Sequence, residues 1–256
     1  MKRKPFWKQA LVCTLSFLFW MLLWFLLAKK VDLSFILPGP IEVFRKLLEL
    51  AKTISFYQIL LATFLRVSSG YLLGIVLGFL LGFLAHLFSP ARALISPLMA
   101  IIRATPVASF ILVVILWLQR EEVPGFISFL MVLPILWQNT LLGFASRDPG
   151  LDEMAKAFRL GHIQKFFRLD LPQVIPYVLS SGKAALGLAW KAGVAAEVLA
   201  LPKVSIGKMI SDAKLYLETV DLYAWTLAII LLSVFLEKVL LHFLPVGKGG
   251  NRARDL

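Results

Sequence analysis

The stretch Ile59–Leu87, which reads ILLATFLRVSSGYLLGIVLGFLLGFLAHL, decides the fold class. It is long and apolar enough to cross a bilayer as one helix, since a crossing takes about 20 mostly apolar residues. Glycines recur every four residues along it and therefore share one helix face, which lets a second helix approach closely. We expect a helix-packing face made of Gly70, Gly74, Gly78 and Gly82.

Five further apolar stretches indicate that the whole chain lies in the membrane. Of its 256 residues 59% are hydrophobic, whereas a soluble domain has roughly 45–50% apolar residues. We therefore predict an all-α membrane protein with about six transmembrane helices, in one domain over residues 1–256. The expected spans are Ala10–Leu27, Ile59–Leu87, Ala93–Leu118, Phe126–Ala145, Val174–Leu201 and Leu222–Leu244.

Basic residues indicate how the chain is oriented. The first span follows four basic residues, as a signal peptide would, but its apolar core is too long and Ala28-Lys29-Lys30 offers no cleavage site, so we expect it to be retained. If the N-terminus is cytoplasmic, thirteen Lys and Arg residues lie on the cytoplasmic side and nine on the outer side. An excess of basic residues on the cytoplasmic side is typical of membrane proteins. The prediction is a multi-pass protein of the cell membrane with both termini cytoplasmic.

A polar stretch between the fourth and fifth spans, Asp148–Pro172, is expected to form a cytoplasmic elbow of two short amphipathic helices. Gly161 is predicted to end the first helix in a left-handed conformation, and Pro172 to move Leu171 out of the helical region. Two interpretations stay open: a surface that a partner grips, or a loop that lies on the bilayer. The apolar faces consist of Leu151, Met154, Ala155 and Phe158 and of Ile163, Phe166 and Phe167.

Polar groups inside the spans are costly in hydrocarbon and therefore suggest function. Lys191 and Glu197 are six residues apart, so they do not share a helix face, and Arg66 is expected to reach toward an interface. Glu197 either lines a cavity or holds two helices together. The residues expected along a translocation path are Arg103, Thr105, Pro106, Asn139, Lys191 and Glu197.

Catalysis and cofactor binding find no support in the sequence. Cys13 is the only cysteine, and the three histidines lie far apart, so no metal or cofactor site is expected. No Gly-Lys pair completes the phosphate-binding pattern G-x-x-x-x-G-K-[ST], so any ATPase must be another subunit. The basic residues are scattered, which argues against nucleic acid as a partner.

The elbow resembles the E-A-A-x-x-x-G loop of permease subunits of binding-protein-dependent ABC importers, in which L-P follows after a dozen residues. Aligning Leu171-Pro172 with L-P places Glu153, Met154 and Ala155 on E-A-A. Arg159 then stands where the family has glycine, and Gly161 follows two residues later.

Other motifs resemble the nitrate/sulfonate/taurine-type branch of that family. They are Leu37-Pro38-Gly39-Pro40 for L-P-S-P, Leu65-Arg66-Val67 for S-L-x-R-V, Arg103-Ala104-Thr105-Pro106 for R-x-x-P, and Gly182–Trp190 with Ala196-Glu197 for G-L-R-x-A-L-G-x-A-W…A-E. The resemblance spans most of the chain after the first helix.

The resemblance implies a MetI-like permease that imports a small polar or anionic solute. It implies three kinds of partner: cytoplasmic ABC ATPases, an extracytoplasmic solute-binding protein, and a second permease subunit, which we expect to be an identical copy. A secondary transporter or channel without ATP stays as the alternative, although no inverted repeat is evident. The residues expected to couple to the ATPase are Glu153, Met154, Ala155, Phe158, Arg159, Gly161, Phe166, Phe167, Leu171 and Pro172.

Overall fold

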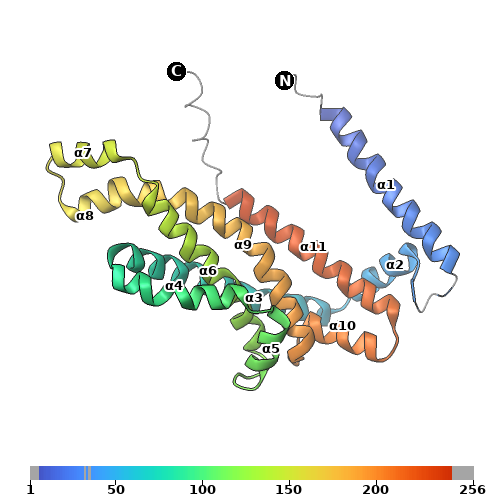
Figure 1. Ribbon diagram of the computed structural model, residues 1–256. Coiled ribbons are helices and arrows are strands. Elements are labelled where there is room, and N and C mark those ends of the chain that lie inside the picture. Colours follow the sequence, from blue (N-terminus) through green and yellow to red (C-terminus); the bar gives the residue numbers. More distant parts are fainter. Residues whose placement is uncertain (1–5, 32, 34–35, 244–256) are drawn as a thin grey trace.

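The computed structural model describes residues 6–31, 33 and 36–243, and this part of the chain contains helices and no strand. The all-α class predicted from the sequence is confirmed. In chain order the helices are α1 Phe6–Val31, α2 Pro40–Leu50, α3 Ile54–Leu87, α4 Ser89–Ala104, α5 Val107–Ile115, α6 Val123–Ala145, α7 Pro149–Ala157, α8 His162–Lys165, α9 Leu171–Ala200, α10 Ile206–Leu215 and α11 Thr219–Phe243 (Figure 1). A π-helical turn, Phe166–Asp170, joins α8 to α9.

Four of the described helices are long and apolar enough to cross a membrane, namely α1, α3, α6 and α11. The expected third span is not one straight helix, because α4 and α5 meet at an angle of 103°. Pro106 has no backbone N–H and disfavours a helical residue before it, and Thr105 is extended with ψ 128°. The expected fifth span is α9, which has 30 residues but carries three charged side chains and is not among the four.

The glycines of α3 allow α6 to pack directly against its backbone. Gly70, Gly74, Gly78 and Gly82 are all buried. A Cβ atom at Gly70 would lie 1.9 Å from the Gly125 carbonyl oxygen, and one at Gly78 would lie 2.6 Å from the Leu136 Cβ. Contacts this close leave no room for a side chain, so the α3–α6 pair depends on the glycine face.

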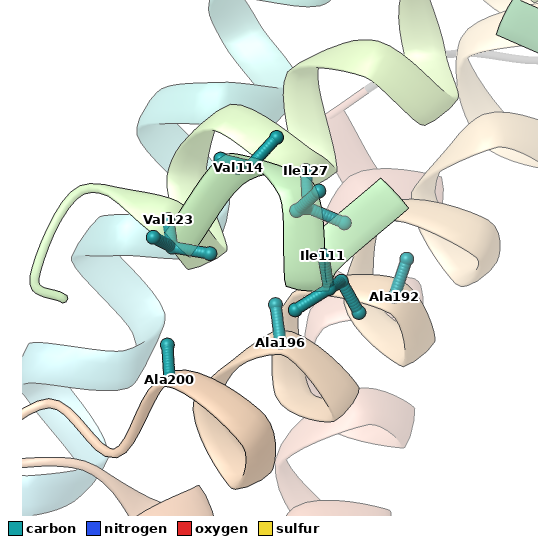
Figure 2. Packing of buried hydrophobic residues seen from close by; sticks show 7 residues of the cluster. All are labelled: Ile111, Val114, Val123, Ile127, Ala192, Ala196 and Ala200. Carbon is teal, nitrogen blue, oxygen red and sulfur yellow. The ribbon is translucent and has the colours of Figure 1, made fainter. Parts of the chain in front are cut away.

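Small residues of α9 similarly receive α5 and α6. Ala192, Ala196 and Ala200 lie one turn apart and form the floor of a buried cluster (Figure 2). Ile111 and Val114 of α5 and two residues of α6 belong to the same cluster. The short helix α5 therefore folds back over the bundle, which the bend after α4 makes possible.

The two ends of the bundle differ in what they carry. Figure 1 shows α7 and α8 toward the upper side, with the beginning of α1 and the end of α11 on that side as well. The helices α2, α5 and α10 lie toward the other end. The elbow therefore lies at the end where α6 stops and α9 begins.

Candidate functional site

The first elbow helix, α7, has well-formed ends. The Asp148 side chain caps its beginning by accepting a hydrogen bond from the Gly150 N–H at 2.8 Å. At its end, the Leu160 N–H donates to the Ala155 carbonyl at 2.9 Å and the Arg159 N–H donates to Lys156 at 3.0 Å. This pair of bonds is the Schellman motif, which needs a left-handed residue after the helix.

That left-handed residue is Arg159, with φ 51°, and not Gly161. Gly161 is extended, with φ −65° and ψ 155°, and precedes α8. The prediction for Gly161 was therefore wrong, because the helix ends two residues earlier than the glycine suggested. Arg159 adopts a conformation that costs a residue with a Cβ roughly 1–2 kcal/mol.

The second half of the elbow continues into α9 without a break. Leu171 is helical, with φ −60° and ψ −44°, so the expectation that Pro172 would move it out of the helix was wrong. The preceding turn, Phe166–Asp170, is π-helical. A local π adjustment of this kind accommodates a proline and the carbonyl that it leaves without a donor.

Aromatic rings and one ion pair attach the elbow to the bundle. The Phe166 ring lies 5.0 Å from Phe83 of α3, and Phe83 lies 5.5 Å from Phe144 of α6. Arg147 bonds Asp170 at 2.6 Å. Phe166, expected to meet a partner, therefore faces its own chain.

A second ion pair joins the two parts of the elbow to each other. Lys165 bonds Asp152 at 2.8 Å, and this hydrogen bond holds the pKa of the Asp152 carboxyl below its usual value. The elbow is consequently a braced unit and not a loose loop.

The elbow still presents apolar side chains to its surroundings. Phe158, Ile163 and Phe167 are 74%, 75% and 62% exposed. Glu153 and Met154 are exposed as well, whereas Ala155 is buried. Exposed apolar side chains of this kind suit either of the two interpretations left open by the sequence, contact with a partner or with the bilayer surface. Ile163 was not among the expected coupling residues, although its place on the second apolar face is visible in the sequence.

Glu197 does not face a cleft, which differs from the path-lining expectation. Its side chain is 0% exposed, and its Oε1 lies 3.0 Å from Arg66 Nη1 of α3. Its Oε2 accepts hydrogen bonds from the Thr63 hydroxyl at 2.9 Å and from the Gly207 N–H at 3.2 Å. The carboxylate thus joins α3, α9 and the beginning of α10. Sequence reasoning missed the partners Arg66 and Thr63.

Two other expected path residues, Arg103 and Asn139, line one cleft of about 440 Å³ between α3, α4 and α6. Arg103, at the end of α4, donates a hydrogen bond to the Gln138 side-chain oxygen. Asn139 lies beside Gln138 in the same wall, and Arg92 and His86 complete it. Thr105 and Pro106 form the bend between α4 and α5, and Lys191 is exposed on α9.

Among the described residues, no group of three or more His, Cys, Asp or Glu side chains could hold a metal ion.

Comparison with known proteins relates the chain to transport proteins. Residues 74–243, which include the elbow, match the model of the family described as "binding-protein-dependent transport system inner membrane component". A probable ABC transporter permease protein of Brucella melitensis is 29% identical over 218 residues, which cover 85% of this chain and 87% of the relative.

Two further relatives have a solute in their names. A putative aliphatic sulfonates transport permease protein of Bacillus subtilis is 26% identical over 191 residues, which cover 74% of this chain and 68% of the relative. A nitrate import permease protein of Leptolyngbya laminosa is 31% identical over 161 residues, which cover 62% of this chain and 56% of the relative.

Proposed function

Because the chain belongs to the family of binding-protein-dependent transport system inner membrane components, we propose that it is the transmembrane permease of an ABC importer for small anions. The solute class is nitrate and small sulfonates, including taurine, a zwitterion that carries an anionic sulfonate group. The named relatives support this choice, since one is named for nitrate and one for aliphatic sulfonates.

The observation that carries the proposal is the braced elbow with its exposed apolar surface. Phe158, Ile163 and Phe167 lie on one 25-residue stretch at one end of the bundle. A few buried aromatic and aliphatic anchors commonly supply most of the binding energy of an interface. In the proposed complex these three side chains enter a cleft of the ABC ATPase, and Glu153 and Arg159 lie at the rim of the contact.

The other partners follow from the same function. An extracytoplasmic solute-binding protein delivers the anion, and a second copy of the chain completes the path. The elbow and both termini are cytoplasmic, so the end that carries α2, α5 and α10 faces the binding protein. ATP is hydrolysed by the ATPase subunits and not by this chain.

The experiment is reconstitution of the full chain in proteoliposomes with an ABC ATPase and a solute-binding protein of the same organism. We expect uptake of radiolabelled nitrate, taurine or methanesulfonate that needs both ATP and the binding protein. Uptake that persists without the ATPase and follows an ion gradient would contradict the proposal, because it would indicate a secondary transporter.

A further inference from the structure

The cleft between α3, α4 and α6 has the composition of an anion site. Its volume of about 440 Å³ lies in the range of small-molecule sites, roughly 300–1,000 Å³. Its polar wall contains His86, Arg92, Arg103, Gln138 and Asn139, and none of the residues that line it is acidic. The positive charge of the cleft therefore comes from Arg92 and Arg103 of α4, and α3 and α6 supply the neutral polar side chains.

The two arginines have no negative partner among the described residues. In the part of the chain that the structure describes, neither Arg92 nor Arg103 forms an ion pair. Arg103 donates to Gln138, but a guanidinium has five N–H donors, so most of them stay available. Cationic side chains among membrane helices are costly unless they meet water or an opposite charge.

A carboxylate of the neighbouring groove already has a partner. Asp170 lines that groove together with His86 and elbow residues. It bonds Arg147 at 2.6 Å, and Arg147 also lies 3.5 Å from the His86 ring. The positive charge of the cleft is therefore not cancelled from this side.

Neutral donors surround the arginines. The Asn139 side-chain amide donates one hydrogen bond to the Ile135 carbonyl at 2.9 Å. Its second N–H is available to a ligand. Gln138 accepts from Arg103 through its oxygen, which leaves its amide N–H₂ group free to donate. The indole N–H of Trp137, which also lines the cleft, is buried without a partner among the described residues. Buried donors of this kind normally have an acceptor.

We propose that this cleft binds a small oxyanion, with three or four oxygen atoms on its central atom or head group, during its passage through the permease. Arg103 and Arg92 supply the charge, and Gln138 and Asn139 supply neutral N–H donors. The fork of a guanidinium matches two oxygens of such an anion at once. That the bound anion is also the transported solute rests on the proposed function.

Direct binding tests the site without the other subunits. The full chain in nanodiscs of neutral lipid is titrated with ¹⁵N-nitrate and with ¹³C-methanesulfonate, and the NMR line width of each probe is measured. Urea is the uncharged control, since it is planar and of nitrate size. We expect both anions to bind in competition with each other and urea not to compete.

Variants assign the binding to the cleft. We expect Arg103→Gln and Arg92→Gln each to weaken nitrate binding by tenfold or more. Arg45→Gln, an exposed arginine of α2, removes the same charge elsewhere and should bind as the wild type does. Arg103→Lys keeps the charge but not the guanidinium fork, so we expect a smaller loss of nitrate affinity than in Arg103→Gln. This variant replaces Arg103→Gln if the glutamine variant does not fold. The proposal is overturned if Arg92→Gln and Arg103→Gln both bind nitrate with wild-type affinity, where Arg103→Lys takes the place of an Arg103→Gln variant that does not fold. It is also overturned if urea competes as well as the anions do.

Transport separates this inference from the proposed function. If the reconstituted complex imports nitrate with ATP and Arg103→Gln imports it equally well, the cleft is not on the path and the permease function stands. If the chain binds nitrate through Arg103 but no complex imports it with ATP, the anion site stands and the proposed function fails.

Discussion

Arg66 of α3 and Glu197 of α9 form an ion pair at 3.0 Å, although 131 residues separate them in the chain. Thr63, one turn before Arg66, bonds the other carboxylate oxygen and also accepts from the Ile206 N–H at 3.1 Å. The cluster thereby fixes α3, α9 and the beginning of α10 relative to one another. These contacts favour the helix-holding role for Glu197 that the sequence left open.

The first prediction concerns this cluster. Glu197→Gln keeps the size of the side chain but leaves the Arg66 charge unpaired, and loss of one partner of a buried pair costs about 3–5 kcal/mol. We expect the lower end, because Arg66 is 18% exposed. Thermal unfolding in nanodiscs measures the loss, and Arg66→Met combined with Glu197→Gln should recover part of it. Unchanged stability with altered uptake would instead assign the charge to transport.

The second prediction concerns the glycine face. Gly70→Ala places a Cβ 1.9 Å from a backbone oxygen of α6, so α3 and α6 must separate. We expect a loss of about 1–3 kcal/mol or more and poor recovery of folded protein. Gly187→Ala is the matched control on α9, where a Cβ meets nothing within 4 Å. It should be neutral or stabilise by about 0.5–1 kcal/mol. Equal effects of the two changes would contradict the packing argument.

The third prediction concerns Arg159. Because this residue has φ 51°, Arg159→Gly should stabilise the end of α7 by about 1 kcal/mol, and Arg159→Val should destabilise it. Hydrogen exchange of the Leu160 amide, which bonds the Ala155 carbonyl, is the measurement. Faster exchange in Arg159→Gly than in the wild type is the result that would count against the left-handed conformation.

The fourth prediction concerns orientation. In a Cys13→Ala background, Arg168→Cys in the elbow should resist a membrane-impermeant thiol reagent added outside intact cells. Val204→Cys, 44% exposed at the other end of the bundle, should react. Both sites should react after the membrane is opened. The reversed pattern would place the elbow outside and remove its access to the ATPase.

Local sequence patterns predicted the helices and the glycine face, because each depends on neighbouring residues. The apolar stretch Ile59–Leu87 gave most of α3. The third span was expected as one stretch, Ala93–Leu118, and the structure divides it into α4 and α5. The elbow was also predicted as two amphipathic pieces.

Tertiary relationships could not be predicted in the same way. Arg66 and Glu197 pair across 131 residues, and no local period encodes that contact. Phe166 turns inward because Phe83 of α3 lies there, which the pattern of the elbow alone does not contain. Arg92 lies just before the expected third span, Ala93–Leu118, and was not among the expected path residues. In the structure it lies on α4 with Arg103, and the cleft forms because α3 and α6 pack beside this helix.

The central claim is that the elbow couples this permease to an ABC ATPase, and Phe167→Asp tests it most directly. Phe167 is 62% exposed, so the change introduces a charge at the proposed contact without disturbing the core. Phe166→Asp is the contrasting variant, which should also destabilise the elbow, because its ring packs on Phe83. Leu215→Asp, at a 73% exposed side chain of α10, is the matched control at the opposite end.

The measurement is ATPase co-purification together with ATP-driven anion uptake by the reconstituted complex. The account predicts that Phe167→Asp inserts and folds as the wild type does but loses at least tenfold in ATPase recovery or in uptake per ATP hydrolysed, whereas Leu215→Asp retains ATPase recovery. Wild-type recovery and wild-type uptake in Phe167→Asp would contradict it.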